Sequence, residues 1–361
     1  MLVLALLLVC SWCWSDAFII KQPCRINTFI KPYRAAVSSD DNCKEVTSIL
    51  QQRAGDGRTS TNTTRRVIKL IDKLSDSMND SDITKAVWET IRYEAAATAD
   101  GDLKVATLMA NAILSQPSLE EAIIDYIANQ IATPSLQATQ LRNLFTEVIT
   151  NEPHVKSLWA FDIMSAATRD VSQPNAISVL LFNQGFTALA TYRIAHSLWR
   201  SGRDGIARYL QSVVSRTFGS DIHPACKIGA GCYLDTGSGV VIGETAVVGD
   251  NCCISHGVTL GGTGKESGDR HPKVGKGVYI SAGATVLGNI QIGEGSIINA
   301  GSVVTKPVAP FTRVGGVPAK FISSFEFNEY ILAELSQEKY IESTEASDAP
   351  QSIVDYHGEP E

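Results

Sequence analysis

Residues 261–273, with the sequence GGTGKESGDRHPK, combine side chains that can bind an anion and exchange a proton. The imidazole of His271 takes up or releases a proton near neutral pH, and the planar guanidinium of Arg270 binds two oxygens at once. Lys265 and Lys273 add further positive charge, and glycines are interspersed among them. We interpret the segment as a candidate functional loop, because loops that leave a rigid scaffold commonly carry function. The alternative is a flexible surface insertion.

The scaffold around this loop has a six-residue period. Within three blocks an aliphatic residue recurs at every sixth position, and glycine often follows it. Neither an α-helix nor a simple strand uses such a period, whereas a β-solenoid places one inward side chain on each face of each coil. We expect the glycines at tight corners that need positive φ. The positions are Ile222, Ile228 and Leu234; Ile242, Val248, Ile254 and Leu260; Val274, Ile280, Val286, Ile292, Ile298 and Val304.

Two irregularities interrupt the period. The step from Leu234 to Ile242 is eight residues, so two residues are extra there. The step from Leu260 to Val274 is fourteen residues, which is where the candidate loop leaves the coil.

The segment that precedes the period, residues 81–220, has a helical pattern. Residues 118–121 (SLEE) predict a capping box, and a stripe with a spacing of four follows: Leu119, Ile123, Ile127 and Ile131. We interpret these helices as serving packing and oligomerisation. His154 and His196 lie in this segment, and we expect them to be structural.

Composition limits the classes of protein that the chain can represent. Of 361 residues, 44% are hydrophobic, which excludes intrinsic disorder of the whole chain, and 31 basic against 38 acidic residues argue against a nucleic-acid binder. No apolar run reaches 18 residues, so we expect no transmembrane helix. The eight cysteines lack zinc spacing, and we expect neither a metal site nor a disulfide framework. Twenty of 28 glycines lie at positions 229–316, which predicts a domain boundary near residue 220.

The two ends of the chain differ from the rest. Residues 1–17 have the apolar core and small residues of a signal peptide. Residues 18–80 are predicted to be a transit-like leader and linker, and residues 18–39 contain basic but no acidic side chains. This bipartite arrangement resembles plastid-targeting leaders, with the secretory pathway or the cytoplasm as alternatives. Residues 324–361 are predicted to be an acidic, disordered tail.

Several strings of residues resemble the serine O-acetyltransferase family of hexapeptide-repeat acyltransferases. The resemblance covers residues 82–323, and its most specific strings are VTLGGTGK at 258–265 and GDRHPK at 268–273. The others are DIHP at 221–224, GETAV at 243–247, GGVPAK at 315–320, TRD at 168–170 and YRIAH at 192–196.

The resemblance implies both a fold and a reaction. The fold is α+β, with an α-helical domain at 81–220 followed by a left-handed parallel β-helix at 221–323. The implied reaction transfers acetyl from acetyl-CoA to L-serine to give O-acetylserine in cysteine biosynthesis, without a metal. The implied assembly is a homotrimer or a dimer of trimers, with the active site between neighbouring subunits.

The resemblance also assigns individual site residues. The co-substrate acetyl-CoA is expected against Gly262, Thr263, Ala282 and Ala300. Serine is expected to be held by Asp170, Asp235, Arg270 and His271. The resemblance matches Asp221 to the aspartate that orients the family's catalytic histidine.

One position departs from the family pattern. Where the family has Leu-Asp-His-Ala-Thr-Gly, residues 234–239 read LDTGSG, so Thr236 replaces the catalytic histidine. Counting 18 residues per coil and two extra ones places His256 one coil above Thr236, and we hypothesise that His256 replaces the base. Family members also carry Gln or His at this position for other reasons. The catalytic candidates are therefore Asp221, His256 and His271.

Other functions remain open at this point. The chain could be a catalytically impaired paralogue that acts as a binding or regulatory subunit, or a hexapeptide acetyltransferase with a different acceptor. The isoleucine that ends many family members and enters O-acetylserine sulfhydrylase is missing from the last residues, HGEPE. The sequence therefore gives no support for that partner.

Overall fold

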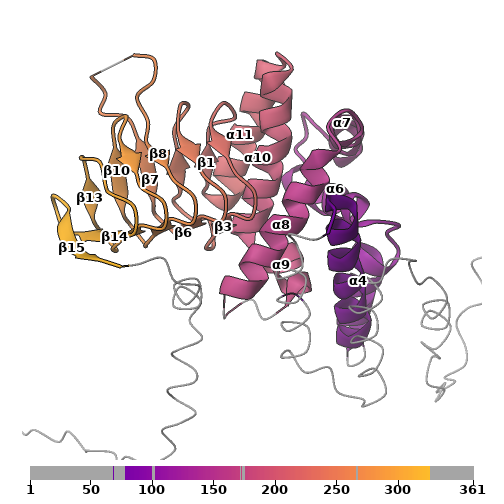
Figure 1. Ribbon diagram of the computed structural model, residues 1–361. Helices are drawn as coiled ribbons and strands as arrows, with labels where there is room; N and C mark the ends of the chain where they lie inside the picture. Colours follow the sequence, from indigo (N-terminus) through magenta and orange to yellow (C-terminus); the bar gives the residue numbers. More distant parts are fainter. Residues whose placement is uncertain are drawn as a thin grey trace, which may run out of the picture. The chain divides into compact units, whose positions relative to one another are not determined.

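The computed structural model describes residues 68, 78–99, 102–170, 172, 175–265 and 267–325. An α-helical region is followed by short parallel strands that stack in three sheets (Figure 1). This confirms the predicted α+β fold, an α-helical region followed by a left-handed parallel β-helix. The predicted signal peptide and most of the predicted leader, linker and tail lie outside the described residues. Among the residues described, no helix is long and apolar enough to cross a membrane.

The helical region packs around a continuous apolar core. In the described residues its helices are α4 (Asp80–Thr98), α5 (Leu103–Met109), the π-helix η3 (Ala110–Leu114), α6 (Leu119–Ile131), α7 (Ala138–Asn151), α8 (His154–Arg169), α9 (Ala176–Phe182), α10 (Gln184–Arg200) and α11 (Asp204–Phe218). Ser118 caps α6, because its side chain accepts a hydrogen bond from the backbone N–H of Glu121 at 3.3 Å. This confirms the predicted start of that helix.

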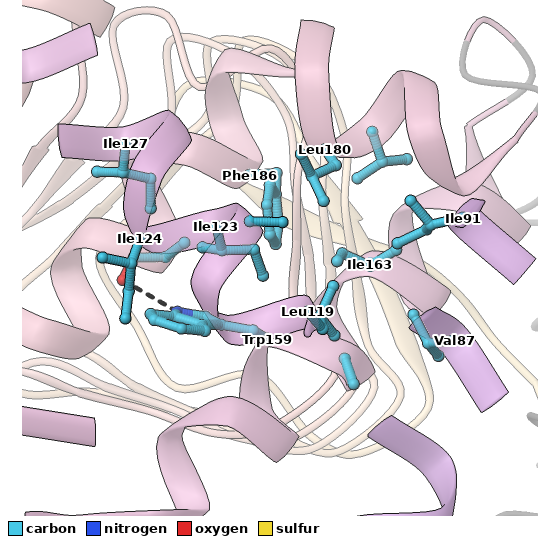
Figure 2. Packing of buried hydrophobic residues seen from close by; sticks show 14 of the residues in the cluster. Val87, Ile91, Leu119, Ile123, Ile124, Ile127, Trp159, Ile163, Leu180 and Phe186 are labelled. Carbon is cyan, nitrogen blue, oxygen red and sulfur yellow. Dashed lines mark hydrogen bonds between the residues drawn. The ribbon is translucent and has the colours of Figure 1, made fainter. Parts of the chain in front are cut away.

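The predicted apolar stripe on α6 lies in this core. All four residues of the stripe are buried, and Figure 2 shows three of them, Leu119, Ile123 and Ile127, beside Trp159 of α8. The indole Nε1 of Trp159 donates a hydrogen bond to the carbonyl oxygen of Ala190 in α10 at 3.1 Å. The stripe therefore belongs to the same apolar core as Trp159.

Three parallel sheets form the β-helix, and an antiparallel strand closes its C-terminal end. The first sheet contains β1 (Asp221–Ile222), β4 (Val241–Ile242), β7 (Thr259–Gly261), β10 (Thr285–Leu287) and β13 (Val303–Val304). The second contains β2 (Lys227–Ile228), β5 (Val247–Val248), β8 (Lys273–Val274) and β11 (Gln291–Ile292). The third contains β3 (Tyr233–Leu234), β6 (Cys253–Ile254), β9 (Tyr279–Ile280), β12 (Ile297–Ile298), β14 (Thr312–Gly315) and β15 (Lys320–Ser324).

The aliphatic residues of the six-residue period pair with one another along each parallel sheet. In the first sheet Ile222 pairs with Ile242, which pairs with Leu260, and the series continues through Val286 and Val304. All thirteen periodic aliphatic residues are buried except Ile228, which is partly buried against the same core. The predicted inward position of one aliphatic residue per face is confirmed.

The glycines that follow the aliphatic residues serve a purpose other than the expected one. Gly229, Gly249 and Gly293 do not have positive φ. A Cβ on each would lie 2.3–2.7 Å from an atom of the next coil, so only glycine allows the coils to stack this closely. The prediction that they provide left-handed corners is therefore wrong for these three positions.

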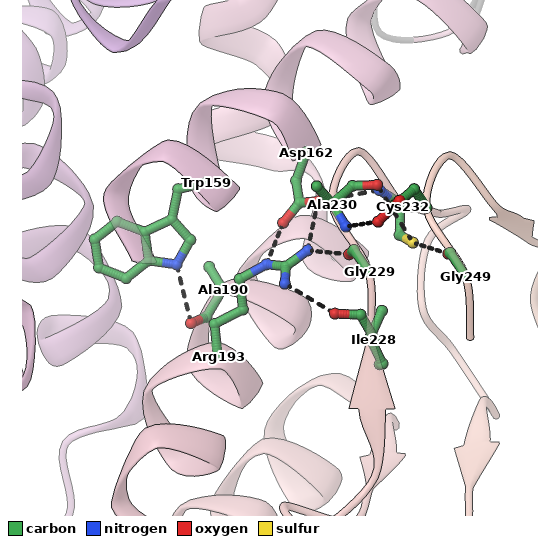
Figure 3. A network of polar contacts seen from close by, with 10 residues as sticks. Trp159, Asp162, Ala190, Arg193, Ile228, Gly229, Ala230, Cys232 and Gly249 are labelled. Atoms are coloured by element: carbon green, nitrogen blue, oxygen red, sulfur yellow. Dashed lines mark hydrogen bonds and ion pairs between the residues drawn. The ribbon is translucent and has the colours of Figure 1, made fainter. Parts of the chain in front are cut away.

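A buried ion pair fastens the helical region to the first coil (Figure 3). Arg193 of α10 binds both carboxylate oxygens of Asp162 of α8, at 2.6 and 2.8 Å, and both side chains are at most 2% exposed. The guanidinium also donates to the carbonyl oxygens of Ile228 and Gly229, while Asp162 accepts the backbone N–H of Cys232. Two helices and one coil are thus held in one arrangement.

Candidate functional site

The predicted site residues gather at two edges of the β-helix. We name the turn from the third sheet to the first the carboxylate corner; it comprises residues 235–240 and the turns stacked on it, 255–258, 281–284 and 299–302. We name the turn from the first sheet to the second the loop corner; it comprises residues 223–226, 243–246 and 261–272. These two corners lie at opposite ends of the strands of the first sheet.

The carboxylate corner contains a stack of four residues on successive coils: Ser238, His256, Ala282 and Ala300. The backbone N–H that follows each of the last three donates to the carbonyl oxygen of the member one coil earlier, at 2.8–2.9 Å. Sequence reasoning placed His256 over Thr236, and this detail is wrong. Thr236 and Gly237 are the two extra residues. Residues that pair on neighbouring coils are therefore twenty positions apart before them and eighteen positions apart after them.

The two extra residues are packed tightly against the helical region. Thr236 has φ +50° and Gly237 has φ +71°, and a β-branched side chain is rarely found at positive φ. Ser220 Oγ donates to the carbonyl oxygen of Gly237 at 2.6 Å. A Cβ on Gly185, near the start of α10, would lie 2.0 Å from the carbonyl oxygen of Leu234. Thr236 is therefore fixed in place, and its hydroxyl is no base near neutral pH.

His256 lies beside a carboxylate. Its Nδ1 is 3.5 Å from Asp235 Oδ2, and the two side chains are 58% and 35% exposed, respectively. With Nδ1 directed towards the carboxylate, Nε2 is free to accept a proton, which is the arrangement that a general base requires. The carboxylate corner therefore contains one accessible imidazole, that of His256.

Asp170 reaches the same corner from the helical region. It follows the last residue of α8, and its Oδ1 accepts hydrogen bonds from the backbone N–H and hydroxyl of Ser172 at 2.8 and 2.7 Å. Its Oδ2 accepts the hydroxyl proton of Tyr233 at 2.6 Å, and the same phenol oxygen is 3.4 Å from Asp235 Oδ1. Burial, followed by the two carboxylates, raises the pKa of Tyr233, so the phenol remains a hydrogen-bond donor.

Asp221 opens the first sheet but has a different partner from the one that the family pattern implies. The described residues contribute one hydrogen bond to its carboxylate, from Nε2 of Gln211 in α11 at 2.6 Å. His223, two residues later, accepts the backbone N–H of Ala225 and packs edge-on against Trp199, with ring centroids 5.2 Å apart. The structure thus shows Asp221 bound to an amide.

The loop corner is organised around one hydroxyl. Oγ1 of Thr245 accepts the backbone N–H groups of Arg270 and His271 at 3.1 and 3.2 Å, and it lies 2.9 Å from His271 Nδ1. Nδ1 also accepts the backbone N–H of Thr245 at 3.2 Å. Because Nδ1 accepts, the neutral ring carries its proton on Nε2. Burial and the Arg270 charge lower the pKa of His271, which keeps it neutral.

Arg270 is held on the outer side of this corner. Its guanidinium binds Glu244 at 2.8 Å and donates to the carbonyl oxygen of Gly268 at 3.0 Å. The hydrogen bond from Arg270 lowers the pKa of Glu244. A Cβ on Gly243 would lie 2.0 Å from His271 Nε2, so the glycine provides the space in which the ring lies.

The four residues expected to contact acetyl-CoA do not lie together in one chain. Ala282 and Ala300 belong to the carboxylate corner, directly beyond His256 in its stack. Gly262 and Thr263 belong to the loop corner, where a Cβ on Gly262 would touch Arg270 at 3.3 Å. In the same way Asp170 and Asp235 are separated from Arg270 and His271.

Sequence reasoning missed three participants in this arrangement. Tyr233 and Thr245 donate protons to Asp170 and His271, and Gln211 binds Asp221. Position gives a signal for two of them, because Tyr233 directly precedes the Leu-Asp string and Thr245 lies within GETAV. The described residues include no group of three or more His, Cys, Asp or Glu side chains placed to hold a metal ion.

Comparison with known proteins adds to this geometry. Residues 87–191 match the family described as serine acetyltransferase, N-terminal, and residues 271–306 match the bacterial transferase hexapeptide repeats. The serine acetyltransferase of Salmonella typhimurium is 45% identical over 236 residues, which are 65% of this chain and 86% of that protein.

Solved structures show the same similarity. Soybean serine acetyltransferase complexed with serine is 43% identical with a TM-score of 0.65, covering 66% of this chain and 99% of that one. Serine acetyltransferase from Brucella abortus in complex with coenzyme A is 43% identical with a TM-score of 0.66, covering 70% and 99%.

Proposed function

The chain belongs to the serine acetyltransferase family, and from this premise we propose how its own residues carry out the reaction. The enzyme is a serine O-acetyltransferase, which transfers the acetyl group of acetyl-CoA to the hydroxyl of L-serine. The C–S bond of the thioester breaks as the new C–O bond forms, and the proton taken from the serine hydroxyl passes to the sulfur of the leaving group, so the products are O-acetylserine and CoA.

His256 is the general base of this proposal. The hydroxyl of serine is a weak nucleophile and must lose its proton as it attacks the thioester carbonyl. An imidazole beside a carboxylate can accept that proton near neutral pH, and Nε2 of His256 is accessible while Nδ1 faces Asp235. The observation that carries the proposal is the position of His256, between Asp235 on one side and the Ala282–Ala300 stack on the other.

The remaining polar groups suit the charges of the substrates. The carboxylates of Asp170 and Asp235 match the serine ammonium, and the guanidinium fork of Arg270 matches its carboxylate. His271 presents Nε2–H as a donor, which can stabilise the oxyanion that forms when the hydroxyl attacks. We assign no proton transfer to Asp221, because its carboxylate is bound by Gln211.

The site is completed by a second copy of the chain in this proposal. One chain provides the base and the ammonium ligands at its carboxylate corner, and a neighbouring chain provides Arg270 and His271 at its loop corner. The separation of the two corners along the first sheet supports this arrangement. The serine and coenzyme A complexes named for the soybean and Brucella relatives support the two substrates.

The test is acetyl-CoA-dependent thiol release by the full chain, with L-serine, D-serine, glycerol or a hexose as acceptor. We expect turnover with L-serine alone, and we expect unchanged turnover in the control variant His154→Ala, because that exposed imidazole lies at the start of α8. Turnover with another acceptor would overturn the choice of substrate. Binding of acetyl-CoA and L-serine without thiol release would instead favour a catalytically impaired subunit, the function that Thr236 by itself suggests.

A further inference from the structure

The phenol of Tyr233 connects the helical region to the β-helix inside the proposed site. Its hydroxyl donates to Asp170 Oδ2 at 2.6 Å, and its oxygen lies 3.4 Å from Asp235 Oδ1. Asp170 ends α8, whereas Asp235 follows β3, so the two carboxylates come from different parts of the fold. Tyr233 is the group that both carboxylates share.

The surroundings leave this phenol little freedom to move. Tyr233 is 6% exposed, and its ring packs with the core of the helical region although the residue belongs to strand β3. The helix that carries Asp170 is itself fixed to the first coil, because Asp162, two turns earlier on α8, accepts the backbone N–H of Cys232 and binds Arg193. The buried contacts of Tyr233 and of Asp162 therefore set the position of Asp170 relative to Asp235.

The hydrogen-bonding capacity of the three groups suits one ligand chemistry. The phenol has a single proton, and it donates this proton to Asp170. Its oxygen therefore faces the Asp235 carboxylate with no proton between them, so two hydrogen-bond acceptors lie next to each other. A primary ammonium group has three N–H donors and no acceptor. The two carboxylates and the phenol oxygen are all acceptors, and they meet beside Asp235, whose side chain is partly exposed. Such a set of acceptors matches the three N–H donors of a primary ammonium group.

We propose that Tyr233 is a positioning residue for the serine ammonium: its hydroxyl holds Asp170 against Asp235, so that both carboxylates face one cation. The inference rests on the proposed function, in which these two aspartates bind serine. It assigns Tyr233 to binding of the amino acid and gives it no part in proton transfer. Loss of the phenol hydroxyl should therefore change affinity for serine and leave the acyl-transfer step alone.

The first test compares Tyr233→Phe with the matched control Tyr279→Phe. Tyr279 occupies the same register position two coils further on and packs against the same apolar core as Tyr233. Hydrogen bonds to charged groups contribute enough that we expect Tyr233→Phe to raise KM for L-serine about tenfold. The kcat and the KM for acetyl-CoA should stay within about twofold, and Tyr279→Phe should resemble the parent. A loss of stability alone would not raise one KM selectively.

The second test is a double-mutant cycle with Asp170→Asn. If Tyr233 acts by holding the Asp170 carboxylate, the increase in serine KM for the double variant should be smaller than the product of the two single increases. Multiplying effects would show that the two residues act independently and would overturn the proposal.

These outcomes separate the inference from the proposed function. Serine-dependent turnover in the parent, with a Tyr233→Phe variant that folds and has unchanged serine KM, overturns the role of Tyr233 and leaves the enzyme assignment intact. A parent that shows neither serine-dependent turnover nor binding of L-serine by calorimetry overturns both. A Tm within a few degrees of the parent shows that the variant is folded.

Discussion

The two corners of the β-helix that carry polar groups differ in how completely they are organised. In the loop corner His271 is 7% exposed, its tautomer is set by Thr245, and backbone N–H groups complete the cluster. In the carboxylate corner His256 is largely exposed and lies 3.5 Å from Asp235, beyond the distance of a hydrogen bond. The loop corner is preorganised by its own chain, whereas the side chains of His256 and Asp235 in the carboxylate corner stay open to solvent.

The largest expected effect is on kcat, because the proposed site combines the carboxylate corner of one chain with the loop corner of a neighbouring chain. His256→Ala and His271→Ala should each lower kcat by about 10²–10⁴, because each removes a group that contacts the reacting atoms. When the two inactive variants are mixed under conditions that exchange subunits, about one site in four should contain both histidines and regain activity. Thiol release before and after mixing measures this.

Mixed variants that stay as inactive as the separate ones, in assemblies shown by native mass spectrometry to be mixed, would contradict a shared site. Each variant mixed with itself is the control.

The buried ion pair of Arg193 and Asp162 should affect the carboxylate corner more than the loop corner, because it fixes α8, the helix that Asp170 follows. Arg193→Met leaves Asp162 buried without its cation, which should lower the free energy of unfolding by about 3–5 kcal/mol. The exposed pair Arg203–Glu147, at 2.9 Å, provides the control, and Arg203→Met should cost at most about 1 kcal/mol. Denaturant unfolding compares the two variants, and equal losses would contradict the role of Arg193 as the anchor of α8.

A smaller effect is expected when the loop corner is overpacked. Gly243→Ala places a methyl group against the ring of His271, which should cost about 1–3 kcal/mol of stability and at least about tenfold in kcat. Gly205→Ala on α11 is the matched control, because nothing lies within 4 Å of a Cβ there. That variant should be as stable as the parent or slightly more so. A Gly243→Ala enzyme with unchanged kcat would show that the position of His271 is unimportant.

The smallest effect concerns the pH dependence of stability. Since the pKa of His271 is lowered in the folded chain, the unfolded chain binds more protons below about pH 6.5, and the free energy of unfolding should fall as the pH decreases. His271→Gln should reduce this slope. Burial also lowers the pKa of His196 and His223, so part of the slope should remain. Thermal unfolding at pH 5 to 8 measures it, and an unchanged slope would contradict a neutral, buried His271.

The repetitive part of the fold was predictable because each repeat obeys the same constraint. An aliphatic side chain must face inward on every face of every coil, and this requirement is written into the sequence as a period of six. The capped start of α6 was predictable for a similar local reason, since Ser118 satisfies a backbone N–H three residues later. Local patterns report local constraints.

The details of the site depend on tertiary contacts and were therefore less accessible. Which residue of the next coil pairs with this turn depends on where the two extra residues lie. Packing against Gly185 and Ser220 fixes them at Thr236 and the following glycine. The role of Tyr233 depends on where α8 ends relative to the first coil, and the Arg193–Asp162 pair decides that. No spacing in the sequence records either contact.

In the function that we propose, His256, which lies on the coil next to that of Asp235, is the general base. The most direct measurement is serine-dependent thiol release by the parent, His256→Ala, Thr236→His and the variant with both substitutions. We predict an active parent, loss of activity by about 10²–10⁴ in His256→Ala, and recovery in the double variant, because an imidazole at position 236 restores a base. An inactive parent that becomes active only through Thr236→His would show that His256 does not act as the base.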